Sequence, residues 1–227
     1  KVVEIAPRFI LAWHDLSTAL KEQGKEVEAV EALALAIDLE PTNALTNYFY
    51  AAALASAGQT LQASLAYKKT IELDPKLAGA YVGLGHVLKT LGDQEGGINA
   101  YRQAIVLRPN FGEIYFSLSN LKTFRFSQSE IENMVERINQ KSLKAESVVH
   151  FAFSLGKAFE DNKDYDQAFH YYNLGNEQHR QSVAYDPVQT ELAHAKLKET
   201  FDVEFFDKIK QTKPGVEDSA PIFIVGL

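Results

Sequence analysis

Hydrophobic residues in the first half of the chain recur with the spacing of one face of an α-helix. In one segment Leu84, Leu88 and Leu91 follow each other at three- or four-residue intervals, which is the helical period. Gly92 comes next, and glycine ends a helix easily because it adopts the left-handed conformation. A second apolar series follows, made up of Ile98, Tyr101, Ile105 and Leu107. The pattern predicts a pair of antiparallel helices.

This two-helix pattern returns every 34 residues, as the prolines Pro7, Pro41, Pro75 and Pro109 show. The other columns in phase are Trp13, Asn47, Tyr81 and Tyr115; Leu16, Tyr50, Leu84 and Leu118; Gly24, Gly58 and Gly92; and Ala29, Ala63 and Gly97. Proline closes each unit because it cannot continue a helix. Since one hairpin cannot bury its own apolar face, neighbouring hairpins must stack.

The spacing of small, large and proline positions resembles the tetratricopeptide repeat family over residues 1–122. The resemblance implies an all-α fold, a right-handed solenoid of helical hairpins whose first unit is incomplete. Two residues depart from the family pattern. Asn47 stands in a column that is aromatic in the other units, and Lys122 stands in the column of Leu54 and Leu88. The regular array is therefore expected to end near Lys122.

Residues 123–210 predict an irregular helical extension of this array. Ser127 and Glu130 have the spacing of a capping box, so a helix is expected directly after them. A fifth hairpin is expected from His150 to about Gln181, without a closing proline. Asp186-Pro187 opens a further helix, because proline is tolerated in a first turn, and Asp202 is expected to cap a short final helix.

The last residues of the chain have a different pattern. Residues 211–220 are mostly polar and contain Pro214-Gly215, which predicts a linker. Residues 221–227 are rich in β-branched and aromatic side chains, which predicts a buried parallel strand. Because nothing earlier in the chain offers a sheet, the strand is expected to belong to an α/β domain that this sequence lacks. With Lys1 at one end and an apolar run at the other, we expect the chain to be part of a longer protein.

Four segments in this order resemble the amino-terminal half of bacterial tetratricopeptide-repeat sulfotransferases: Leu121–Phe126, Leu155–Asp161, Phe205-Phe206 and Ala220–Leu227. In that family the last strand leads into a Pro-Arg-Ser-Gly-Thr-Thr loop that holds the 5′-phosphate of 3′-phosphoadenosine 5′-phosphosulfate. The loop is absent here, so no cofactor-binding or catalytic residue is predicted. The resemblance implies this cofactor for the parent protein alone. The acidic net charge and the absence of cysteine fit a bacterial cytoplasmic location.

The tetratricopeptide resemblance also implies a concave groove that takes an extended or helical peptide. Its candidate lining residues are His14, Thr18, Tyr48, Ala52, Val82, His86 and Lys89. The alternative is a groove that is merely solvated or filled by segments of the chain itself. The Lys, Asn and Arg side chains with which some family members hold a peptide carboxylate are not found in the corresponding phases. The expected partners are a protein or peptide ligand and the protein's own catalytic domain.

Composition and charge exclude several other classes of function. Hydrophobic residues make up 46% and charged residues 23% of the 227 residues, as in ordinary folded domains. The net charge of -7 gives no electrostatic footprint for nucleic acid or an anionic membrane. There is no cysteine and no apolar run of membrane-spanning length. No histidine pair has the i, i+4 spacing of a helical metal site.

Three hypotheses of function remain at this point. The chain is the repeat region of a sulfotransferase, or a free-standing scaffold of a multiprotein complex, or the repeat region of another enzyme such as a glycosyltransferase or kinase. The first predicts that the codons after Leu227 encode Pro-Arg-Ser-Gly-Thr-Thr or a close variant. In each case the chain itself is a binding module rather than a complete enzyme.

Overall fold

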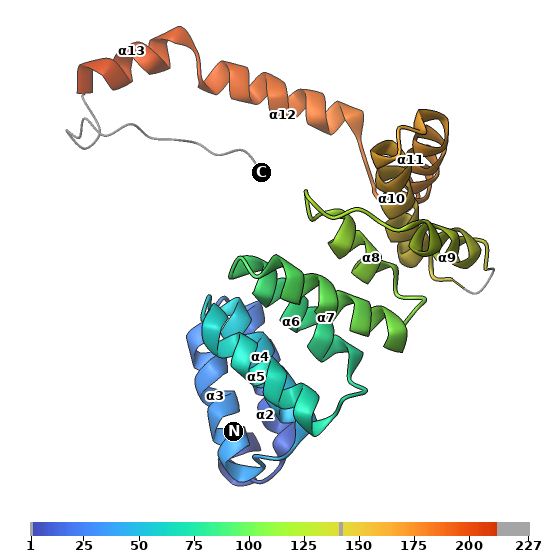
Figure 1. Ribbon diagram of the computed structural model, residues 1–227. Coiled ribbons are helices and arrows are strands. Elements are labelled where there is room, and N and C mark those ends of the chain that lie inside the picture. Colours follow the sequence, from blue (N-terminus) through green and yellow to red (C-terminus); the bar gives the residue numbers. More distant parts are fainter. Residues whose placement is uncertain (1, 141–142, 213–227) are drawn as a thin grey trace. The chain divides into compact units, whose positions relative to one another are not determined.

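The computed structural model describes residues 2–140 and 143–212, and all regular secondary structure in these residues is helical (Figure 1). The helices are α1 (Val2–Ile5), α2 (Ile10–Glu22), α3 (Glu26–Leu39), α4 (Ala44–Ser56), α5 (Thr60–Leu73), α6 (Ala78–Thr90), α7 (Gln94–Leu107), α8 (Gly112–Ser119), α9 (Gln128–Ile138), α10 (Ala145–Asp161), α11 (Tyr165–Arg180), α12 (Pro187–Thr200) and α13 (Val203–Thr212). The all-helical solenoid is confirmed. Because α13 runs through Thr212, the first two residues of the predicted linker at 211–220 are helical. The rest of the linker and the strand predicted at 221–227 lie outside the described residues.

The first three hairpins are α2–α3, α4–α5 and α6–α7, and each second helix also packs against the first helix of the next hairpin. The turn glycines Gly24, Gly58 and Gly92 have φ angles of 69°, 72° and 84°. Glycine adopts this left-handed conformation without the steric cost that a Cβ imposes. The 34-residue period therefore arises from a glycine turn within each hairpin and a proline between hairpins.

The column of Trp13 has a structural role that explains its one polar member. Trp13 donates a hydrogen bond through Nε1 to the carbonyl of Pro7 at 2.8 Å. Asn47 donates through Nδ2 to the carbonyl of Pro41 at 3.1 Å, and Tyr115 makes the same bond to Pro109 at 3.4 Å. Asn47 thus keeps the donor, although it lacks the ring. In three of the four units, the side chain in this column thus satisfies the carbonyl of the preceding proline.

The apolar faces form the core as predicted, with one exception. Leu84 and Leu88 are buried, and they pack with Tyr67 and Ala80 between neighbouring hairpins. Leu91, which was expected on the same face, is 44% exposed. The reason is that Leu91 is the C-cap of α6, where the chain already turns away from the helix axis.

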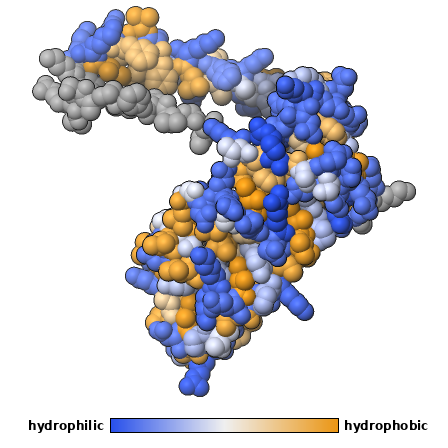
Figure 2. Space-filling view, viewed as in Figure 1, coloured by the Kyte–Doolittle hydropathy of each residue, from blue (hydrophilic) through white to orange (hydrophobic). Residues whose placement is uncertain are grey.

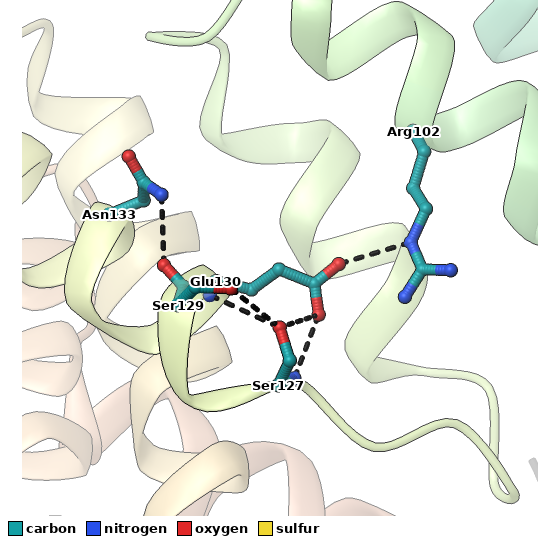
Figure 3. A network of polar contacts seen from close by, with 5 residues as sticks. All are labelled: Arg102, Ser127, Ser129, Glu130 and Asn133. Carbon is teal, nitrogen blue, oxygen red and sulfur yellow. Dashed lines mark hydrogen bonds and ion pairs between the residues drawn. The ribbon is translucent and has the colours of Figure 1, made fainter.

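The fourth unit departs from the regular pattern at the position predicted from Lys122. Helix α8 is short, and an irregular segment leads to α9, whose amino terminus carries the predicted capping box between Ser127 and Glu130. Figure 3 shows Arg102 of α7 pointing toward the same glutamate, with Nε 3.1 Å from Oε1. The capping box therefore also joins α9 to the third hairpin.

A fifth hairpin, α10–α11, packs against α8 and extends the core. Phe151 and Leu155 of α10 are fully buried, together with Ile114 of α8 and Met134 of α9. The predicted hairpin is confirmed, and it follows the α6–α7 hairpin column by column at a distance of 71 residues, as Gly156 follows Gly85.

The chain forms two compact units, Lys1–Gln181 and Ser182–Leu227, so the predicted extension at 123–210 divides after Gln181. In the second unit Pro187 occupies the first turn of α12 with Asp186 as its N-cap, and Asp202 caps α13, as predicted. Helix α12 has no buried residue.

Figure 2 shows that hydrophobic side chains interrupt the polar surface of the first unit. Leu61 and Leu65 of α5, for example, are 63% and 60% exposed.

Candidate functional site

Three hollows share residues along the first helices of consecutive hairpins. The first hollow, of about 340 Å³, is lined by α4, α5, α6 and α8. The second, of about 390 Å³, shares His86 and Glu113 with the first. The third, of about 360 Å³, shares His150 with the second and Arg108 with the first. We call this connected surface the groove. It lies entirely within the first compact unit.

Four of the seven residues predicted to line a groove do line it. Tyr48, Val82 and His86 line the first hollow, and His86 and Lys89 line the second. These four residues therefore lie at the hollows, and their part in binding a peptide stays a prediction.

The other three predicted residues lie outside the three hollows. His14 is 5% exposed, and its Nε2 is 3.1 Å from Oγ1 of the fully buried Thr46, so it joins α2 to α4. Thr18 is exposed and donates a hydrogen bond to the carbonyl of His14 in its own helix. Ala52 is half-buried on α4. The His14 ring also packs against Phe49 of α4, with ring centroids 4.5 Å apart.

The sequence reasoning missed Tyr67, Arg108, Glu113, Phe116 and His150, which line the groove. Phe116 lies 34 residues after Val82, so the concave phase could have been extended into the fourth unit. Tyr67 lies on a second helix, and only its packing brings its hydroxyl into the first hollow. Arg108 lies between helices, where no periodicity operates.

Glycines decide where the tyrosines of the first hollow lie. A Cβ at Gly79 would lie 3.2 Å from the Tyr48 hydroxyl, and a Cβ at Gly83 would overlap the phenol end of Tyr67. The two rings pack with centroids 6.2 Å apart. The absence of side chains at these two positions of α6 leaves the space that both rings use.

Burial sets the protonation of the polar groups. Burial raises the pKa of Tyr67, and the nearby Tyr48 hydroxyl raises it further. Burial also raises the pKa of Tyr101, to about 12. Both hydroxyls therefore stay protonated and can donate hydrogen bonds. Burial lowers the pKa of His86. The Glu113 carboxylate acts in the opposite direction and raises this pKa, whereas the Lys89 ammonium lowers it further. His86 keeps an exposed edge, yet its Nδ1 is covered by the Tyr101 hydroxyl at 2.8 Å. Near pH 7 its imidazole is neutral.

Two stacked rings form an aromatic wall of the second hollow. Phe116 of α8 stacks on His150 of α10 with ring centroids 5.3 Å apart, and His150 also lines the third hollow. Charged residues surround this wall, including Lys89, Glu113 and Glu146. Apolar surface with a few charges of both signs is suited to a peptide chain.

Residues 2–140 and 143–212 contain no cluster of three or more side chains that could hold a metal ion. No helix in these residues combines the length and the apolar character that crossing a membrane requires.

Comparisons with known proteins support the fold on independent grounds. The tetratricopeptide repeat family matches residues 10–43 and 78–111, which are the first and third hairpins. No curated protein matches the sequence. Among solved structures, "MamA 41-end from Desulfovibrio magneticus RS-1" has a TM-score of 0.57 at 17% identity, covering 77% of this chain and 97% of that one. A second, "Crystal structure of MamA protein", has a TM-score of 0.56 at 20% identity, covering 78% and 98%.

These matches establish the class of fold. Residues 10–43 and 78–111 match the tetratricopeptide repeat, and the fold of the chain is similar to that of MamA over 77% of its length. At this level of identity the similarity concerns the fold, and function must be argued from the groove.

Proposed function

We propose that this chain is a protein-interaction module whose groove binds a peptide segment of a partner protein. The observation that carries the proposal is the group of three adjoining hollows that share His86, Glu113, Arg108 and His150. Adjoining hollows on a helical scaffold can each take a side chain of an extended chain or a helix.

The groove also has the chemical character that a peptide requires. The Phe116 and His150 rings offer contact area for apolar side chains. Lys89, Arg108, Glu113 and Glu146 can orient a partner by charge. The rigid packing of the supporting helices limits the entropy that is lost on binding.

A display selection tests this function. The whole chain would be presented with random twelve-residue peptides, and the affinities of retained peptides would be measured by calorimetry. We expect Val82→Arg, which fills the first hollow, to weaken binding at least about 10-fold, corresponding to ~1.4 kcal/mol. The matched control is Val27→Arg on α3, where the wild-type side chain is 62% exposed and lies outside the groove.

Two results would count against a peptide groove. One is that the selection retains no peptide. The other is that Val82→Arg and Val27→Arg weaken binding equally, which would place the binding surface elsewhere. A melting curve of each variant separates loss of binding from loss of fold.

The free-standing scaffold is the form of this proposal that the repeat match supports. The positioning region of a sulfotransferase, with 3′-phosphoadenosine 5′-phosphosulfate bound by the parent, stays a prediction based on sequence motifs. Its test is the gene sequence: the six codons after Leu227 encode the phosphate loop or they do not. Binding of that nucleotide to the chain itself at micromolar affinity would contradict the prediction that the loop is required.

A further inference from the structure

Three tyrosines occupy equivalent positions on the second helices of their hairpins: Tyr67 on α5, Tyr101 on α7 and Tyr172 on α11. The hydroxyl of Tyr101 lies 2.8 Å from Nδ1 of His86, and that of Tyr172 donates to Oε2 of Glu160 at 2.8 Å. Both partners lie on the first helix of the same hairpin. Tyr67 differs, because no hydrogen bond joins its hydroxyl to another group within residues 2–140 and 143–212.

One methyl group explains why Tyr67 lies elsewhere. Tyr101 and Tyr172 lie across glycines of their own hairpins, and a Cβ would come within 2.6 Å of Tyr101 at Gly85 and within 2.5 Å of Tyr172 at Gly156. The equivalent position in the second hairpin is Ala51, whose Cβ occupies that space. The Tyr67 ring therefore lies over Gly83 of the next hairpin, at the first hollow.

The usual hydrogen-bond partners are also missing from the second hairpin. Ala52 occupies the position of His86, and Ala55 occupies the position that corresponds to Glu160. Neither alanine can accept or donate a side-chain hydrogen bond. Tyr67 is only 5% exposed, so its side-chain hydroxyl is accessible only from the first hollow. A donor held rigidly at the wall of a cavity favours a ligand that supplies an acceptor.

The remaining polar groups of the first hollow define what that ligand is. Tyr48 supplies a second hydroxyl, Arg108 a guanidinium, and Glu113 a carboxylate. Arg108 stacks over Phe111 at 4.9 Å. A free anion would meet the Glu113 carboxylate and a free cation the Arg108 guanidinium, so each would meet a like charge. A neutral group with both an acceptor and a donor satisfies the tyrosines and Glu113 together.

We propose that the first hollow is an amide-recognition subsite, in which Tyr67 and Tyr48 donate to the carbonyl oxygen and Glu113 accepts from the N–H. The amide belongs either to the backbone of the bound peptide or to an Asn or Gln side chain. This inference rests on the peptide-binding function proposed above and specifies the chemistry of one part of the groove.

Small amides test the subsite without a partner peptide. Protein with ¹³C-labelled tyrosines would be titrated with four probes, namely N-methylacetamide for the backbone, acetamide for the side chain, acetate, and methylguanidinium. We expect one or both amides to shift the Tyr67 and Tyr48 signals saturably, at least about fivefold more tightly than either ion. The stronger amide identifies the source. Tyr50, which is outside the three hollows, serves as the internal control.

Two variants make the outcome decisive. Tyr67→Phe removes only the hydroxyl, and because this group has no partner in the described residues the melting temperature should not change. Amide affinity at Tyr48 should fall about 5- to 10-fold, the loss of one hydrogen bond. Ala51→Gly combined with Ala52→His copies Gly85 and His86, which gives the Tyr67 ring space and a hydrogen-bond partner in its own hairpin, and this variant should also weaken amide binding. Equal amide affinity in wild type and Tyr67→Phe, or tighter binding of an ion, would overturn the subsite. If display peptides still bind with normal affinity, the peptide function survives that result; if amides bind but no peptide is retained, the subsite survives and the peptide function does not.

Discussion

The third hairpin, α6–α7, and the fifth, α10–α11, solve the same packing problem with different residues. Both place a leucine in the core, at Leu84 and Leu155, and both begin the second helix with an aspartate N-cap, at Asp93 and Asp164. They differ at the turn and in the polar residue at the groove phase, where His86 corresponds to Lys157. The comparison teaches that core and caps define the hairpin, while the turn and the groove face can vary.

The largest expected effect tests the shared core. Leu155→Ala and Leu84→Ala should each lower the free energy of unfolding by about 2–5 kcal/mol, because they leave cavities in packed cores. Leu155→Ala should lower the free energy of unfolding more than Leu84→Ala does, since Leu155 is fully buried whereas Leu84 is 8% exposed. Denaturant titration measures both. Leu197→Ala on α12, where the leucine is 54% exposed, is the control and should stay within about 0.5 kcal/mol of wild type. A small effect at Leu155 would show that the fifth hairpin is not part of the shared core.

The next effect concerns the glycines under the tyrosine rings. Gly85→Ala and Gly156→Ala should each destabilise by about 1–3 kcal/mol, because the added Cβ overlaps Tyr101 or Tyr172. In either hairpin the alanine variant combined with Tyr→Ala should recover part of the loss, since the clash partner is gone. Thermal melts of the single and double variants measure this coupling. Additive losses would mean that the rings do not lie on the glycines.

A smaller effect separates the two turns. Lys163 has φ 63°, in the position where Gly92 has φ 84°. Lys163→Gly should stabilise the protein by about 1 kcal/mol, because a non-glycine residue is strained in this conformation. Gly92→Lys should destabilise it by a similar amount. If Lys163→Gly instead lowers the melting temperature, the lysine side chain contributes more than its backbone strain costs.

The smallest effect is a pH dependence of the third hairpin. Burial lowers the pKa of His86 in the folded protein, so the unfolded chain binds a proton more readily below about pH 6.5. The contribution of His86 to stability is therefore present at neutral pH. It is lost as pH falls from about 6.5 through the lowered pKa. The stability difference between wild type and His86→Gln should shrink over this range in urea titrations. A difference independent of pH would mean that His86 is not desolvated.

Periodicity predicted much of the fold, and the reason is local. The repeat, the turn glycines at 24, 58 and 92, and the capping box at Ser127 and Glu130 all depend on helix geometry and chain turns. Such features depend on residues that are close together in the sequence. The exposed Leu91 shows the limit of this reasoning, because the apolar spacing continued past the point where α6 ends.

The candidate site was predicted only in part. Tyr48, Val82, His86 and Lys89 followed from the concave phase of the first helices. His14 has the same phase as Tyr48, yet it is buried against Thr46 and Phe49 because α2 packs against α4 at that point. Phase identifies the face of a helix, but it does not tell whether a neighbour covers that face.

The sequence by itself determined the hairpins, their repeat length and the side of each helix that packs inward, since these depend on helical period and on the conformational limits of glycine and proline. Only the tertiary structure decided where the second-helix tyrosines lie. Ala51 in place of a glycine excludes the Tyr67 ring from its own hairpin, and Gly83 accepts it in the next one. That choice depends on contact distances between residues far apart in the chain, because closely packed interiors have no space for one additional carbon atom.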